Sequence, residues 1–137
     1  MRKVIRVILI FVVLLLVAYL IFVNIPQATI KSKDAIEKVE ATMLYKAFND
    51  SEQEAENKYL GKVLEVTGTI DELYEDENGT PVVVLKNETG DPVVLVTLDA
   101  GQAKLISRYS EGSQIRLKAL CSGMLMEVTL TKGIIIE

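Results

Sequence analysis

One apolar run constrains the fold of this chain more than any other feature. Residues 7–23 carry no charged side chain, and three basic residues lie within the first six positions. A helix over residues 7–25 would be about 28 Å long, close to the hydrocarbon thickness of a bilayer. The run is too long and too uniformly apolar for a buried core helix. It predicts a transmembrane anchor within residues 1–25.

We interpret this anchor as one that stays attached. Its apolar run exceeds the roughly 7–15 apolar residues of a cleaved signal peptide. The sequence after the run lacks a good pair of small residues for cleavage, and Pro26 would hinder a cut after Ala28. Cleavage remains the open alternative. The basic residues ahead of the run favour a cytoplasmic N-terminus. The rest of the chain is then outside a cytoplasmic membrane, in a periplasm or at a cell surface.

The rest of the chain is acidic and lacks several residue types that catalysis uses. It carries 12 basic and 19 acidic residues, a net charge of −7, which repels polyanions on average. There is no histidine, the commonest general base and zinc ligand. Cys121 is the only cysteine, and its place in an alternating apolar pattern predicts a buried, inert thiol. We expect no enzyme activity, no metal and no cofactor.

After a linker over residues 26–33, residues 34–60 are expected to form helices. Asn49-Asp50-Ser51 interrupts them, and Ser51 can cap the second helix. That helix has acidic early turns and ends with Lys58, as the helix dipole favours. In the first helix, apolar residues recur at spacings of three and four, at Ile36, Val39, Met43, Leu44, Ala47 and Phe48.

From Gly61 the apolar period changes to two, which predicts strands. Turn signals at Asn78-Gly79 and at residues 89–92 separate three strands. Residues 99–109 predict a short helix capped by Asp99, and two more strands follow. This order is that of an OB-fold, a five-stranded Greek-key barrel with a helix between strands 3 and 4. We assign the barrel to residues 61–137, so the fold class is mainly β with N-terminal helices.

Two details of the predicted strands need a structural reason. Gly68 interrupts the alternation of the first strand, as expected where a barrel strand bends and another backbone comes close. An incidental glycine at a strand edge is the alternative. A tight turn at Ser122-Gly123 is expected to lead into the last strand. The residues expected to face inward there are Met124, Met126, Val128 and Leu130.

The motif Lys58-Tyr59-x-Gly61-Lys62, followed by Val66-x-Gly68-x-Ile70, resembles the tRNA-anticodon-like OB-fold family of bacterial envelope proteins. The stretches "GSQIRLKALCSG" and "EVTLTKGIII" are similar to its closing hairpin. The resemblance covers residues 41–136. It implies an OB barrel preceded by helices in an exported or membrane-attached protein, and it does not establish RNA binding. Gly133 stands where the family is expected to carry a second cysteine, so Cys121 is expected to stay free.

Together these observations predict a membrane-anchored, non-enzymatic module that binds an envelope protein or peptide. One alternative is a binder of single-stranded nucleic acid, since OB folds bind single strands through basic grooves with stacking aromatics, features that are sparse here. The other alternative is a small-ligand or cation site in the acidic stretch 71–77, which lacks the spacing of a calcium loop. The expected ligand groove consists of Glu65, Thr67, Thr69, Tyr74, Arg116 and Lys118.

Overall fold

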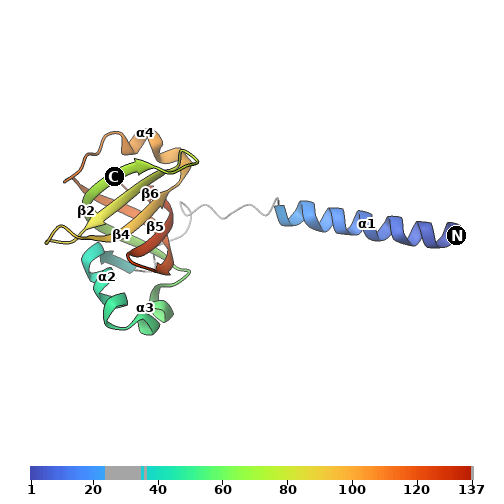
Figure 1. Cartoon of the computed structure of the whole chain (residues 1–137), viewed down its shortest axis with the longest axis horizontal. Helices are drawn as coiled ribbons and strands as arrows, with labels where there is room; N and C mark the ends of the chain where they lie inside the picture. The colour runs from blue at the N-terminus through green and yellow to red at the C-terminus, as the bar shows by residue number, and fades with distance from the viewer. Residues whose placement is uncertain (24–34, 36, 137) are drawn as a thin grey trace.

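In a computed structural model of the chain, residues 1–23, 35 and 37–136 are described (Figure 1). The strands follow the order β1-β2-β3-β4-β6-β5, and a further pairing of β2 with β5 closes five of them into a barrel. The predicted mainly β fold and its closed five-stranded barrel are therefore confirmed. The strands are β1 (Glu37–Glu40), β2 (Val63–Glu75), β3 (Pro81–Lys86), β4 (Pro92–Leu98), β5 (Gln114–Met124) and β6 (Val128–Ile135).

The connection from β4 to β5 covers one end of the barrel (Figure 1). It holds a 3-10 turn (Ala100–Gln102) and α4 (Ala103–Ile106). The Asp99 carboxylate accepts the Gly101 backbone N–H at 3.0 Å, which confirms the predicted cap. The buried Gln102 side chain accepts the backbone N–H of Ile135 at 2.9 Å, so a polar group fixes this connection to β6.

The other end of the barrel is covered by α2 (Ala41–Asp50) and α3 (Glu52–Tyr59) (Figure 1). The helical prediction is wrong for residues 37–40, which form β1, parallel to β2. The sequence of β1, Glu-Lys-Val-Glu, alternates with period two as a strand does. The helix α2 therefore begins only at Ala41, and its buried face consists of Ala41, Leu44 and Phe48. Met43, which we expected inside, is 57% exposed.

Ser51 lies at the N-cap of α3, as predicted, but its side chain makes no capping hydrogen bond there. Its carbonyl oxygen instead accepts the Ala55 backbone N–H at 3.0 Å. The acidic first turn and the basic last turn of α3 are confirmed. The rings of Phe48 and Tyr59 lie 6.3 Å apart, centroid to centroid, and join the two helices over the barrel.

Gly68 is where α2 comes closest to the barrel wall. Leu64, Val66 and Ile70 on the same face of β2 are fully buried, as predicted. A Cβ atom at Gly68 would lie 3.0 Å from the Ala41 Cβ and 3.0 Å from Leu85 Cδ1, closer than side chains normally approach. Gly68 is therefore closely packed, but the nearest atoms belong to side chains and not to the second backbone that we predicted.

The predicted start of the last strand is wrong. Ser122 and Gly123 lie inside β5, and the register between β5 and β6 shifts between Cys121 and Gly123. The strand β5 continues to Met124, so the turn lies at residues 125–127 and β6 begins only at Val128. Met126 is therefore 79% exposed, whereas Val128 and Leu130 are buried as expected. Cys121 is buried and free.

At the N-terminus, α1 spans Arg2–Val23. Its described side chains, residues 8–19, are exposed to solvent. No helix in the described part of the chain is long and apolar enough to cross a membrane. The anchor predicted within residues 1–25 is not supported by this finding and stays a prediction. The predicted linker, residues 26–33, lies outside the described residues.

Candidate ligand groove

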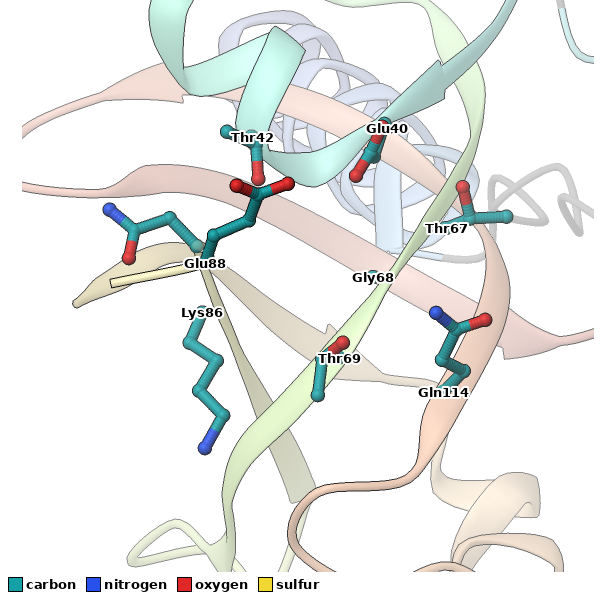
Figure 2. Close-up of a pocket in the computed structure, with 9 residues that line it drawn as sticks. Glu40, Thr42, Thr67, Gly68, Thr69, Lys86, Glu88 and Gln114 are labelled. Carbon is teal, nitrogen blue, oxygen red and sulfur yellow. The ribbon is translucent and has the colours of Figure 1, made fainter. Parts of the chain in front are cut away.

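The ladder of strands is interrupted on one side of β2 at Gly68. Before this point β2 pairs with β1, up to Thr67 opposite Glu40. After it, β2 pairs with β3, from Thr69 opposite Lys86. A cleft of about 320 Å³ lies where the two neighbours leave β2 (Figure 2). It is lined by Glu40, Thr42, Thr67, Gly68, Thr69, Lys86, Asn87, Glu88 and Gln114.

The turn between β3 and β4 forms one wall of this cleft. The Asn87 side-chain oxygen accepts the Asp91 backbone N–H at 2.8 Å. The Asp91 carboxylate accepts hydrogen bonds from the Thr89 hydroxyl at 2.6 Å and from the Asn87 amide at 3.1 Å. These bonds, the one from Thr89 first, lower the pKa of Asp91. They order the turn, and the Glu88 side chain extends from it toward Thr42 (Figure 2).

The cleft is polar and its charges are mixed. Glu40 and Glu88 bring carboxylates from two separate elements. The Lys86 Nζ lies 3.4 Å from the Asp71 carboxylate, and its chain points away from Thr42 (Figure 2). Among the described residues, no hydrogen bond engages the side chains of Thr42, Thr67 or Gln114. Hydroxyl and amide groups therefore remain free to donate to a ligand and to accept from it.

A second hollow, of about 340 Å³, adjoins this cleft and shares Thr67 and Gln114 with it. Its other lining residues are Tyr109, Ile115, Arg116 and Ile136. The cleft and the hollow together run across the outer face of β2 and β5. We call them the β2–β5 groove.

The predicted site residues divide into three groups. Thr67, Thr69 and Arg116 line the β2–β5 groove. Glu65 and Lys118 face each other one step beyond it in the register of β2 with β5. Tyr74 lies near the far end of β2, opposite Val82, and lines neither hollow.

Glu65 holds Arg116 at the edge of the groove. Its side chain is 14% exposed and lies 3.7 Å from the Arg116 Nη1 and 3.6 Å from the Lys38 Nζ. Lys118 faces Glu65 across the ladder on the β5 side. Two cations therefore pair with the Glu65 carboxylate, and a third, Lys118, is its neighbour on β5.

The sequence analysis did not predict the lining residues that β1 and the β3–β4 turn contribute to the cleft. Glu40 and Thr42 line the cleft because β1 pairs with β2 before the chain turns into α2. The signal was the period-two alternation of "EKVE", which the helical spacing of the following residues obscured. Lys86 and Glu88 showed no local pattern. The alternation of "QIRLKALC" put Gln114 on the same face as Arg116, but only the barrel brings these segments together beside β2.

The acidic stretch that suggested a cation site forms the end of β2 and the start of the turn after it. The Asp76 carboxylate accepts the backbone N–H groups of Asn78 at 2.8 Å and of Thr80 at 2.9 Å. The bond from the Thr80 backbone is the larger cause that lowers the pKa of Asp76. Within the described residues, no group of three or more potential ligands is placed to hold a metal ion.

Comparison with known proteins identifies relatives of the fold. A sequence model of the tRNA_anti-like family matches residues 1–135. No curated protein matches the chain. A crystal structure from Klebsiella pneumoniae, described as a "putative nucleic acid-binding lipoprotein", has a TM-score of 0.60 at 16% identity, over 73% of this chain and 91% of that one. That likeness shows a shared fold.

Two more distant structures are similar over most of this chain. A "putative aspartyl-tRNA synthetase" from Leishmania major has a TM-score of 0.48 at 12% identity, covering 81% of this chain and 22% of that one. Yeast Stn1 and Ten1 give a TM-score of 0.44 at 12% identity, covering 82% and 68%.

Proposed function

The chain belongs to the tRNA_anti-like family, and from that premise we propose that its barrel is a non-enzymatic module that binds an extended polypeptide segment. The observation that supports this proposal is the β2–β5 groove, in which two hollows are joined through Thr67 and Gln114. An extended peptide offers alternating donors and acceptors along its backbone, and a polar groove beside a strand can pair with them. The mixed charges of the groove suit a peptide that carries both signs.

Single-stranded nucleic acid is the second candidate. The fold likeness to the Klebsiella protein favours it, as do Lys38, Arg116 and Lys118 around Glu65. However, Glu40 and Glu88 in the cleft would repel a phosphate backbone. Tyr109, half-buried, is the aromatic residue that lines the groove, whereas nucleic-acid channels present several stacking rings. These groups make a polypeptide the better ligand.

The proposal is tested with a phage-displayed library of random dodecapeptides, selected on the full-length protein in detergent. Selected peptides should bind the wild type and lose about tenfold or more in affinity for Thr67→Arg, which fills the centre of the groove. The matched control is Glu77→Arg, the same new side chain on an exposed turn outside the groove. It should bind as the wild type does.

Two results would count against the polypeptide. One is a selection without enriched sequences, or peptides whose affinity ignores Thr67→Arg. The other is tight binding of a single-stranded dodecanucleotide that weakens steeply with salt, since released counterions produce that dependence. The second result would favour the nucleic-acid candidate.

We also propose that α1 attaches the barrel to the cytoplasmic membrane, with the barrel in the periplasm or at the cell surface. The uncharged run over residues 7–23, the basic residues before it and the exposed apolar side chains of α1 support this proposal. A protein attached in this way stays in the membrane pellet at alkaline pH. Protease should remove the barrel from intact cells if it lies at the surface, and from cells with an opened outer membrane if it lies in the periplasm; release of the protein by alkali would contradict the attachment.

A further inference from the structure

The hairpin between β5 and β6 exposes two large apolar side chains at its tip. Leu125 is 93% exposed and Met126 is 79% exposed. The Leu125 backbone N–H donates to the Glu127 carbonyl oxygen at 3.2 Å, so the tip is a closed turn that holds both side chains outward. The protein core does not use them, and they lie outside the β2–β5 groove.

The tip lies at the end of the barrel where β1 begins. β1 is parallel to β2, and its first residue, Glu37, is opposite Leu64 near the start of β2. β5 is antiparallel to β2 and passes Val63 at Leu120 before it continues to the tip. The end of β5 and the first residue of β1 therefore lie at the same end of β2.

Two further contacts describe this end of the barrel. A Cβ at Gly123, just before the tip, would lie 3.5 Å from the Leu60 Cδ1, and Leu60 is itself 43% exposed. The Lys58 Nζ lies 2.9 Å from the Glu37 carboxylate and links the first residue of β1 to α3. The apolar tip, the exposed Leu60 and the start of β1 thus lie at one end of the barrel.

We infer that the tip formed by Leu125 and Met126 inserts into the surface of the bilayer to which α1 attaches the barrel. This inference rests on the membrane attachment proposed above. A convex apolar tip fits a fluid lipid surface, which needs no complementary pocket. Glu52 lines the hollow beside Leu125, and Glu127 follows the tip. Because both are acidic, the tip suits an uncharged phosphatidylcholine surface better than an anionic one.

The test uses the full-length protein in phosphatidylcholine vesicles, labelled with an environment-sensitive dye at Met126→Cys. Cys121 is buried and should stay unlabelled, which the wild type checks. The matched control is Glu77→Cys, in the exposed turn between β2 and β3. We expect the dye at position 126 to shift its emission to shorter wavelength and to be quenched by brominated lipid, and the dye at position 77 to do neither.

The outcomes separate the two proposals. If the protein stays with the vesicles at alkaline pH but the dye at position 126 is not quenched, the membrane attachment stands and the insertion is overturned. If alkali releases the protein, both fail. A blue shift that grows with protein density and ignores brominated lipid would show that a second copy covers the tip, which also overturns the insertion.

Discussion

The two faces of β2 differ in burial and in polarity. On the inner face, Leu64, Val66 and Ile70 are fully buried, and Gly68 leaves room for Ala41 and Leu85. On the outer face, Glu65, Thr67 and Thr69 remain partly or fully exposed and face polar neighbours from β1, β3 and β5. Adjacent residues of one strand therefore have different roles. The inner face stabilises the barrel, and the outer face is free to bind.

This comparison predicts that adjacent substitutions on β2 will separate stability from binding. Inner-face changes should lower the free energy of unfolding and affect binding only through unfolding. Outer-face changes should alter binding at nearly constant stability.

The largest expected effect is that of Leu64→Ala on the inner face. Leu64 is fully buried, and removal of such a side chain leaves a cavity that costs about 2–5 kcal/mol. Urea denaturation of the full-length protein in detergent, followed by tyrosine fluorescence, measures the change. An effect of Leu64→Ala no larger than that of Glu65→Ala would break the comparison.

The next effect is that of Gly68→Val, which tests the close approach of α2. The new side chain would meet Ala41 and Leu85, where a Cβ already lies at 3.0 Å, and overpacking of this kind costs about 1–3 kcal/mol. The neighbouring Thr67→Val, on the exposed outer face, should stay within about 0.5 kcal/mol of the wild type. Equal losses for the two valines would show that Gly68 is an incidental glycine.

A smaller effect is expected for Glu65→Gln, which removes the charge between Lys38 and Arg116. Surface ion pairs contribute about 0–1 kcal/mol, and the pairs here have distances of 3.6 and 3.7 Å. The variant should therefore lose less than about 1 kcal/mol of stability, and the loss should shrink in 1 M salt. A loss that salt leaves unchanged would contradict stabilisation by surface ion pairs.

The smallest effect concerns the inner-facing Cys121 of β5. Burial raises the pKa of its thiol above the ordinary 9.0, so the folded state holds the proton more firmly than the unfolded chain does. This contribution is fully present below pH 9.0 and decreases as the pH rises toward the folded pKa. Between pH 7 and pH 10, wild type should lose slightly more stability than Cys121→Ala. Equal losses would contradict a buried thiol.

The contrast between the two faces also explains what the sequence could predict. Alternation of apolar residues in "VLEVTGTI" and "QIRLKALC" is a local signal, and burial follows it directly, so the barrel and its core were predictable. The β2–β5 groove depends on pairings between distant segments. Gln114 and Glu88 enter it only because β5 and β3 both lie beside β2.

Two local predictions were wrong because the sequence pattern did not show where one element ends and the next begins. The strand β1 was hidden because its alternation is only four residues long and precedes a true helical stripe. Met126 was expected inside because the pattern could not show that β5 continues through Met124, so that residues 125–127 form the turn.

The central claim, that the outer face of β2 and β5 binds a polypeptide, is tested most directly by photocross-linking in the protein's own membranes. A benzophenone amino acid replaces Gln114 in the groove in one variant and Glu77 outside it in another. We predict an adduct at position 114 that protease removes, that nuclease leaves intact and that Thr67→Arg abolishes, with none at position 77. A nuclease-sensitive adduct, or equal adducts at both positions, would contradict the account.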